Sequence, residues 1–581
     1  MAPDSDPEIL ADGGARTPLP RIAVFAGPNA TILNSPPLVT GRGRSGPHGV
    51  RATAREPGLW PQRLAAPVTV FVEALSAHPL EHDAGDLYGP PDAWIDEAGA
   101  VQETEVPGST AAYRVVLQPS DGLYLLPYVA SQADGSPWDD TGTESEAPRA
   151  KNRQTFYPDA SRLYEEIDRF GVGYAGRGAL LSSQAHFDHY RAAPSGGWTT
   201  GRPHGEGSLE RDGEDFFAYF PHHLATEPTT TDLAAITNQV QRVMASGRYQ
   251  GAQWLEGNPT IEETLYWLGL LIDTTVPIVG HAAQRPHLAV GADGDRNIVD
   301  GVAYIASGVW ADQGGADRLG AVLIVDEVVL SARQVAKSDA RPGNYVAVGG
   351  HGGVVASFGG DGPIHLTFVP VRRHTYCSDL RLSTLPASVD AVRDRGAGPT
   401  VEPVATLTGS GELRAEAIPH VTIHTYARYR PAVPPGVSEE PAIGAEIADN
   451  LLHFPLAGFV GEGNSPYVTM HPSTDVALRR AVFSGMAVVK VGRGHPGGDA
   501  HRRDHLFIAG NDLTATKARL LLMAAMLKLG AMPPAADPTA PPSTRSRPCS
   551  PTSPGIRPSS TPTDPGRAAD LRVILRLSVR P

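Results

Sequence analysis

The chain is 581 residues long, which exceeds the size of one typical hydrophobic core, so we expect at least two packed domains. Hydrophobic residues make up 41% and charged residues 19% of the sequence, a balance typical of a globular protein. The formal net charge of −14 argues against a general nucleic-acid or anionic-membrane binder, because both classes need basic surfaces.

The cysteine content and the N-terminal residues bear on location. Two cysteines, Cys377 and Cys549, exclude a disulfide scaffold and a cysteine-based zinc site, and they suit a reducing compartment. Residues 1–14 lack the basic region and apolar core of a signal peptide. No apolar run approaches the roughly 20 residues that span a bilayer. We therefore expect a cytoplasmic protein with no membrane partner.

The first part of the chain has one clear element and one obscure region. Residues 1–20 are expected to form a loose leader, and residues 21–26 form a short apolar run that suits a buried parallel strand. The region from about 50 to 221 mixes Gly, Pro, Asp and aromatic residues. Within it, three pieces have strand-like or helix-like patterns: residues 68–73, 113–118 and 160–170.

From residue 230, short apolar strands alternate with amphipathic helices. Thr231 can cap a helix whose apolar residues fall on one face, and Thr260 opens a second helix. The apolar runs of strand length are residues 253–255, 276–279 and 321–325. This alternation predicts an α/β fold with a parallel sheet covered on both faces.

Residues 390–404 are rich in Gly, Pro and charge, which predicts an interdomain linker. The alternation then resumes, with strands expected at 421–424 and 487–491 and helices at 475–484 and 514–529. From residue 533 onward, Pro, Ser, Thr and Arg dominate, which is typical of a disordered tail and also fits a frame-shifted gene end. The predicted units are therefore an N-terminal domain at 21–400, a C-terminal domain at 401–532 and a tail at 533–581.

Several segments resemble motifs of the bacterial L-asparaginase/glutaminase family. Residues 257–264, GNPTIEET, are similar to the family signature G-T-D-T-M-E-E-T. Residues 333–337, RQVAK, are similar to R-D-V-T-K, whose lysine is catalytic in the family. Residues 277–286 resemble its P-V-V … G-A-M-R-P segment, and residues 292–297 resemble its S-A-D-G-x-x-N turn.

In the second half, residues 461–464 resemble the family's G-x-G-N loop, and residues 513–522 resemble its closing L-x-P-x-K-A-R helix. All these segments keep the family's order across residues 225–530. The resemblance implies a larger N-terminal and a smaller C-terminal α/β domain, with most of 50–221 as an insertion. It also implies a homodimer or homotetramer that acts on a small amide, at the carboxyl ends of the first domain's strands. No cofactor and no metal are expected.

Family enzymes hydrolyse a side-chain amide through a threonine, whose hydroxyl needs a base or strong hydrogen-bond partners to attack a carbonyl. Thr31 occupies the position of the first family nucleophile, and Asn29 with Ala30 replaces a glycine pair beside the substrate. No tyrosine follows in the lid interval at 33–44. The alternative is that Thr31 only caps or packs a turn.

The family's second constellation, Thr-Asp-Lys, is broken. Asn258 replaces the threonine and Pro259 replaces the aspartate, so Lys337 has lost the carboxylate that would orient it. Asn258 can still bind a substrate amide or an oxyanion, whereas proline offers neither a side-chain acceptor nor an N–H. Structural alternatives are a capping box formed by Thr260 and Glu263, and a solvated surface role for Lys337.

Two further candidates are weaker. Thr226 is the nearest residue to the family serine that binds the substrate α-carboxylate, so it is a candidate substrate-binding residue. His186 and His189 could bind a metal on one helix face, but no matching carboxylate pattern flanks them, and scattered surface histidines are commoner.

Three hypotheses remain. The first is an amidohydrolase that acts on a linear or cyclic C–N bond other than that of plain asparagine, with Thr31 as nucleophile and Asn258 and Lys337 as polar helpers. The second is a non-catalytic relative that binds a small ligand or a protein partner. The third is a decayed or frame-shifted gene product that still folds. Under the first, the three side chains must converge on one pocket.

Overall fold

The computed structural model describes residues 19–27, 30, 32–33, 60–63, 68–72, 91–96, 101–117, 123–126, 156–157, 163–164, 167, 181–191, 228–285, 291–341, 343–348, 353–359, 363–429, 442–465, 467–493 and 506–539. Among these residues, no helix is both long and apolar enough to cross a membrane.

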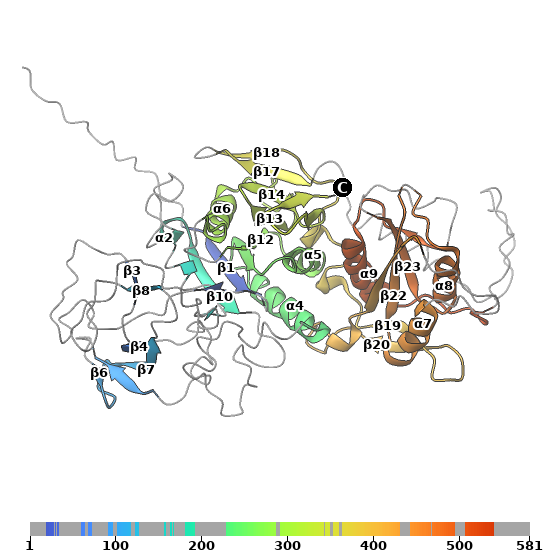
Figure 1. Cartoon of the computed structure of the whole chain (residues 1–581), viewed down its shortest axis with the longest axis horizontal. Coiled ribbons are helices and arrows are strands. Elements are labelled where there is room, and N and C mark those ends of the chain that lie inside the picture. The colour runs from blue at the N-terminus through green and yellow to red at the C-terminus, as the bar shows by residue number, and fades with distance from the viewer. Residues whose placement is uncertain are drawn as a thin grey trace, which may run out of the picture.

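The described residues contain an eight-stranded sheet with strand order β10-β1-β11-β12-β13-β14-β17-β18. The strands from β10 to β13 are parallel, and those from β13 to β18 are antiparallel. In sheet order their bounds are His186–Arg191, Arg21–Ala26, Gly251–Leu255, Ile278–His281, Val322–Val325, Val328–Ser331, Val354–Phe358 and Ile364–Leu366. Figure 1 shows this sheet with β17 and β18 at its upper edge.

Helices cover both faces of this sheet, because its central strands are apolar on both sides. In β1, Ala23 and Phe25 belong to the core shared with α4 (Thr230–Met244) and α5 (Ile261–Leu271). Ile22, Val24 and Ala26 belong to the core shared with α6 (Gly294–Ser307). The predicted α/β fold is therefore confirmed.

The short helix α2 (Leu181–Gln184) precedes β10.

The helix starts differ from those expected. Helix α4 is capped by Thr229, whose hydroxyl accepts from Thr231 N at 3.2 Å while Asp232 accepts from Thr229 N at 2.6 Å. The prediction of Thr231 as the cap is wrong by two residues. Thr260 precedes α5 but makes no side-chain cap hydrogen bond, so the capping box with Glu263 does not form.

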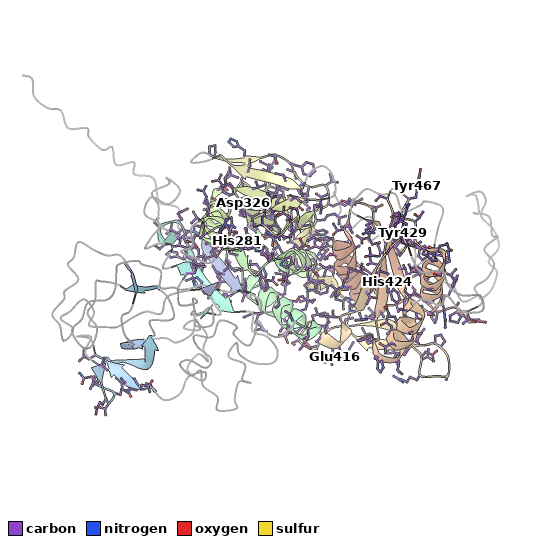
Figure 2. The ribbon with its side chains drawn as sticks, viewed as in Figure 1. His281, Asp326, Glu416, His424, Tyr429 and Tyr467 are labelled. Carbon is purple, nitrogen blue, oxygen red and sulfur yellow. The ribbon has the colours of Figure 1, made fainter. Side chains whose placement is uncertain are left out.

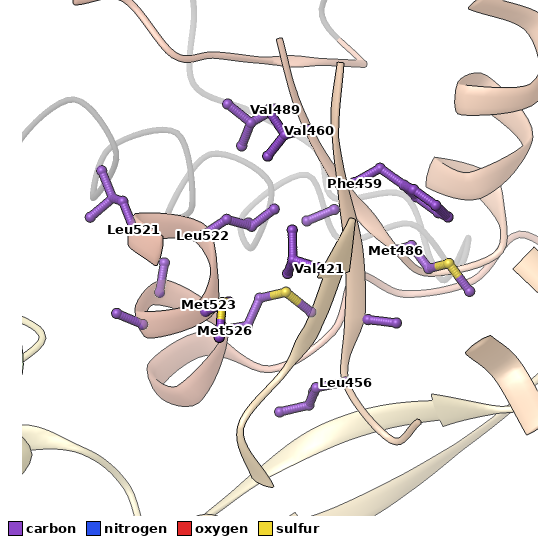
Figure 3. Close-up of a cluster of buried hydrophobic side chains, with 14 of the residues drawn as sticks. Val421, Leu456, Phe459, Val460, Met486, Val489, Leu521, Leu522, Met523 and Met526 are labelled. Atoms are coloured by element: carbon purple, nitrogen blue, oxygen red, sulfur yellow. The ribbon is translucent and has the colours of Figure 1, made fainter. Parts of the chain in front are cut away.

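A second sheet has the order β21-β22-β23-β24 and is parallel; its bounds are His420–Thr425, Ala457–Gly463, Ala487–Gly492 and Ile508–Ala509. The helices of this part are α7 (Ala442–His453), α8 (Pro472–Phe483) and α9 (Ala515–Leu529). Helix α9 is buried nearly all round, since it packs between α5 and the second sheet (Figure 1). Figure 3 shows side chains of α9, including Leu522 and Met526, packed with Val421 and Val460 of the sheet.

The predicted linker at 390–404 is wrong. Strands β19 (Ser388–Arg393) and β20 (Thr400–Ala405) pair as an antiparallel hairpin. Val389, Ala391 and Val392 are buried in the C-terminal core, and the carboxylate of Asp394 accepts from Gly396 N at 2.8 Å in the turn. Glycine and charge were therefore signals of a hairpin turn. Short 3-10 helices lie nearby at Thr375–Cys377, Leu382–Thr384 and Ala415–Ala417.

The stretch predicted as an insertion contains strands of its own. Strands β4, β7, β5 and β6 form one sheet, and β3 and β8 form an antiparallel pair. Strand β9 pairs antiparallel with β2, which precedes this stretch. From β2 to β9 the bounds are Ile32–Leu33, Trp60–Arg63, Val68–Val72, Ala93–Ile95, Val101–Gln102, Thr110–Leu117, Leu123–Leu126 and Phe156–Tyr157. Strand β10, from the same stretch, pairs with β1 in the main sheet. The domain boundaries themselves stay predictions.

Candidate functional site

Asn258 lies at the carboxyl edge of the main sheet, between β11 and α5. Its peptide bond with Pro259 is cis. The Asn258 amide nitrogen donates to Ala283 O at 2.9 Å, and its amide oxygen accepts a short hydrogen bond from the Tyr345 hydroxyl. These two contacts fix which end of the amide is nitrogen. Among the residues that the structure describes, they leave one N–H of Asn258 for a further acceptor.

Lys337 ends β15 (Val335–Lys337) and lies opposite Tyr345, the first residue of β16 (Tyr345–Ala347). Its ammonium group donates to Gly343 O at 2.5 Å, to Arg341 O at 2.7 Å and to Gln284 Oε1 at 3.1 Å. An ammonium has three N–H groups, so these oxygens can take all of them. The nitrogen lies 5.0 Å from the centroid of the Tyr345 ring.

Tyr345 therefore connects the two predicted residues: it bonds Asn258 and lies under Lys337. Burial raises the pKa of Tyr345, and the nearby carboxylates of Glu262 and Glu256 raise it further. The hydroxyl stays protonated and acts as a donor. Burial lowers the pKa of Lys337, an effect that nearby aspartates oppose.

The other predicted site residues, Thr31, Asn29 and Thr226, lie outside the described residues. The described residues next to Thr31 in the sequence, Gly27 and Ala30, follow β1 at the carboxyl edge of the main sheet, where Asn258 also lies. Gly27 N donates to Leu255 O at 2.8 Å, and Ala30, which is buried, donates its N–H to Gly27 O at 3.0 Å. The roles of Thr31, Asn258 and Lys337 stay predictions.

Sequence reasoning missed Glu256, which directly follows β11 and is 5% exposed. Its carboxylate accepts from Trp254 Nε1 at 2.7 Å and from Thr264 Oγ1 at 3.1 Å. Burial raises the pKa of Glu256 to about 7, although these hydrogen bonds oppose the rise. The sequence does place an acidic residue directly after a predicted buried strand, and this pattern could have identified Glu256 as a candidate site residue.

Asp293 and Asn297 hold the loop that carries Gln284. The Asp293 carboxylate accepts from Gln284 N at 3.3 Å and from Arg285 N at 3.1 Å. Asn297, 1% exposed, donates to Ala282 O at 2.9 Å and accepts from Asp326 N at 3.2 Å. The segment with the family-like turn therefore positions the loop after β12, and it is more than a local turn.

Glu262 connects this site to the C-terminal part. Its carboxylate accepts from Lys337 N at 2.7 Å, and its main-chain oxygen accepts a short hydrogen bond from the ammonium of Lys517 in α9. Lys517 is 1% exposed, and burial lowers its pKa to about 8. A second connection lies close by, where Asp512 pairs with Arg333 at 2.7 Å and with Arg372 at 2.6 Å.

The proposed helix-face histidine pair is wrong. His186 and His189 lie on strand β10, where residues three apart point to opposite faces of the sheet. His189 is buried, and burial lowers its pKa to about 4. Over the described ranges, no group of three or more His, Cys, Asp or Glu side chains could hold a metal ion.

Figure 2 locates these regions. It labels His281 and Asp326 on the part that contains the main sheet, and His424, Tyr429 and Tyr467 on the part that contains the second sheet. The residues that contact Asn258 and Lys337 belong to the first part, on the segments that follow β11, β12 and β15.

Comparison with known proteins adds family information. The family model "Asparaginase, N-terminal" matches residues 206–355. L-asparaginase 2 of Escherichia coli (strain K12) is 27% identical over 281 residues, which cover 46% of this chain and 64% of that protein. L-asparaginase 2 of Bacillus subtilis (strain 168) is 24% identical over 299 residues, which cover 51% of this chain and 66% of that protein.

A glutaminase-asparaginase of Acinetobacter glutaminasificans is 29% identical over 109 residues, 19% of this chain and 31% of that protein. A crystal structure of a probable cytoplasmic L-asparaginase from Campylobacter jejuni aligns with a TM-score of 0.38 and 22% identity, covering 53% of this chain and 78% of that chain. The chain spans less than two thirds of the length of each of these three curated relatives. The family match over residues 206–355 and the curated relatives show that this part of the chain is similar to the asparaginase family, in agreement with the motif order along residues 225–530.

Proposed function

We propose that the chain is an amidohydrolase that cleaves the C–N bond of a small, amino-acid-like amide. The observation that supports it best is the cluster of Asn258, Lys337 and Tyr345 at the carboxyl edge of the parallel strands. Ligands of open α/β sheets bind at this edge. Similarity to the asparaginase family makes amide hydrolysis the first reaction to test.

In this proposal, Asn258 and Lys337 stabilise the negative charge that develops on the substrate carbonyl oxygen. The hydrogen bonds to Tyr345 and Ala283 O hold the Asn258 amide in a fixed orientation. Its remaining N–H can therefore bind the developing oxyanion with little reorganisation of the site. The longest hydrogen bond of the Lys337 ammonium is the 3.1 Å bond to Gln284, which a substrate oxygen can replace. The positive charge of Lys337 then acts at short range.

The nucleophile in the proposal is Thr31. Its oxygen bonds to the carbonyl carbon, the C–N bond breaks, and the hydroxyl proton passes to the departing nitrogen; water then hydrolyses the ester. The support is positional, since Gly27 is hydrogen-bonded to Leu255 just before Asn258. Asn29 and Thr226 are proposed to contact the substrate. Pro259 removes the aspartate of the family's second constellation, so a substrate other than plain asparagine is proposed.

Assembly and location belong to the same proposal. A homodimer or homotetramer is proposed because the family resemblance implies one. A cytoplasmic location is proposed from the two cysteines of the sequence.

The test is ammonia or amine release from a panel of linear and cyclic amides. We expect Lys337→Met to lower kcat/KM by about a hundredfold, the size of loss seen when one oxyanion donor is removed. Lys528→Met is the matched control, because Lys528 also donates to a main-chain carbonyl, that of Asp379, but lies at the end of α9. No release by folded wild-type protein from any amide would favour the non-catalytic binding alternative.

A further inference from the structure

A cleft of about 430 Å³ lies beside the candidate site, between the β15–β16 hairpin and strands β14 and β17. This volume is within the usual range for small-ligand pockets, roughly 300–1,000 Å³. Most of its wall is aliphatic, from Val328, Leu330, Val346 and Val354. Val346 and Val354 are each 39% exposed, so the cleft presents apolar side chains to the space that a ligand would fill.

The cleft shares residues with the candidate site. Tyr345 is one of its lining residues, and the Tyr345 hydroxyl donates to Asn258. Asp326 also lines the cleft, and a Cβ placed on Gly343 would lie 2.0 Å from its carboxylate. Gly343 O is the acceptor that holds the Lys337 ammonium at 2.5 Å. Two wall residues of the cleft therefore adjoin the groups proposed to bind the amide.

The wall chemistry limits what can occupy the cleft. Aliphatic walls favour an apolar group, because burying apolar surface from water is favourable. The carboxylate of Asp326 repels an anionic group. An alkyl or similar substituent, neutral or cationic, fits both conditions.

We infer that the cleft is the binding site for an apolar substituent of the substrate, so that the enzyme acts on amides larger and more apolar than asparagine. The inference rests on the proposed function for the reaction itself. The alkyl group binds against Val346 and Val354, and the amide group reaches the free N–H of Asn258 past the ring of Tyr345. Tyr345 thus separates the apolar part of the site from the polar part.

The test is a titration of the full chain with n-alkyl carboxamides from propanamide to hexanamide, in which ligand-detected NMR measures the binding. We expect the dissociation constant to fall by about fourfold for each added methylene, the effect of burying one such group. Hexanoate, which has the same chain but an anionic end, is expected to bind more weakly than hexanamide. Equal affinity across the amide series would overturn the inference.

Val354→Phe places a larger side chain in the cleft and is expected to abolish the chain-length dependence while propanamide still binds. Val369→Phe is the matched control, because Val369 is 37% exposed and does not line the cleft. Chain-length dependence that persists in Val354→Phe would place the alkyl group elsewhere and refute the inference. Hydrolysis of the same amides is measured separately, so absence of hydrolysis refutes the proposed function while the binding series still tests the cleft.

Discussion

The hydrogen bond between Tyr345 and Asn258 gives the sharpest quantitative prediction. Tyr345→Phe removes the donor and leaves the Asn258 amide oxygen unpaired in a site where Tyr345 is 8% exposed. Removing one partner of such a part-buried hydrogen bond costs about 1 kcal/mol of unfolding free energy. Asn258→Ala removes the same bond and also the bond to Ala283 O.

A double-mutant cycle isolates the shared bond, since each single substitution already breaks it. We expect the double variant to be more stable than the sum of the two single losses predicts, by about 1 kcal/mol. Urea unfolding followed by tryptophan fluorescence is a suitable assay, because Trp254 and Trp267 are fully buried in this part of the fold. Additive losses within about 0.3 kcal/mol would show that the two side chains do not interact.

Three other predictions concern stability. The pKa of Glu256 is raised from 4.5 to about 7, so as the pH rises the folded protein holds this proton to a higher pH than the unfolded chain does. The free energy of unfolding should therefore fall by about 3 kcal/mol between pH 4.5 and 7. Glu256→Gln should remove that fall, which is checked by measuring the unfolding free energy at about pH 5 and pH 8. Asp512→Ala should cost about 3–5 kcal/mol in urea unfolding, because it leaves the buried Arg333 without its carboxylate; a cost under about 1 kcal/mol would contradict this. Gly301→Ala should lower the melting temperature, since a Cβ there would lie 2.2 Å from a buried histidine nitrogen, whereas Gly409→Ala, with nothing within 4 Å, should not.

Elements whose own residues determine their structure could be predicted from the sequence. Residues 21–26 form β1 with the expected bounds. A short apolar run by itself predicts a strand that is buried on both faces, so no contact with a distant residue has to be known. The helix expected at 514–529 is α9, with Thr514 as its cap and Gly530 at its end. The hairpin at 388–405 was missed, because its burial depends on the C-terminal core and its turn residues resemble a linker.

The polar surroundings of the site could not be predicted in the same way. Tyr345 and Asn258 are separated by 87 positions in the chain, and they meet because the β15–β16 hairpin folds back over the end of β11. Motif comparison identified Lys337 and the loss of its aspartate. It could not show that carbonyl oxygens and Gln284 would hold the ammonium instead. Those contacts depend on backbone geometry, which residue types alone do not specify.

The identity of the nucleophile is the most direct test of the account, and kcat/KM for ammonia release should be compared in wild type, Thr31→Ala and Thr31→Ser. With the best amide of the panel, we predict that turnover disappears in Thr31→Ala and persists at a reduced level in Thr31→Ser, because serine keeps a hydroxyl. Equal turnover in wild type and Thr31→Ala would contradict the account, since the amide would then be cleaved by another group.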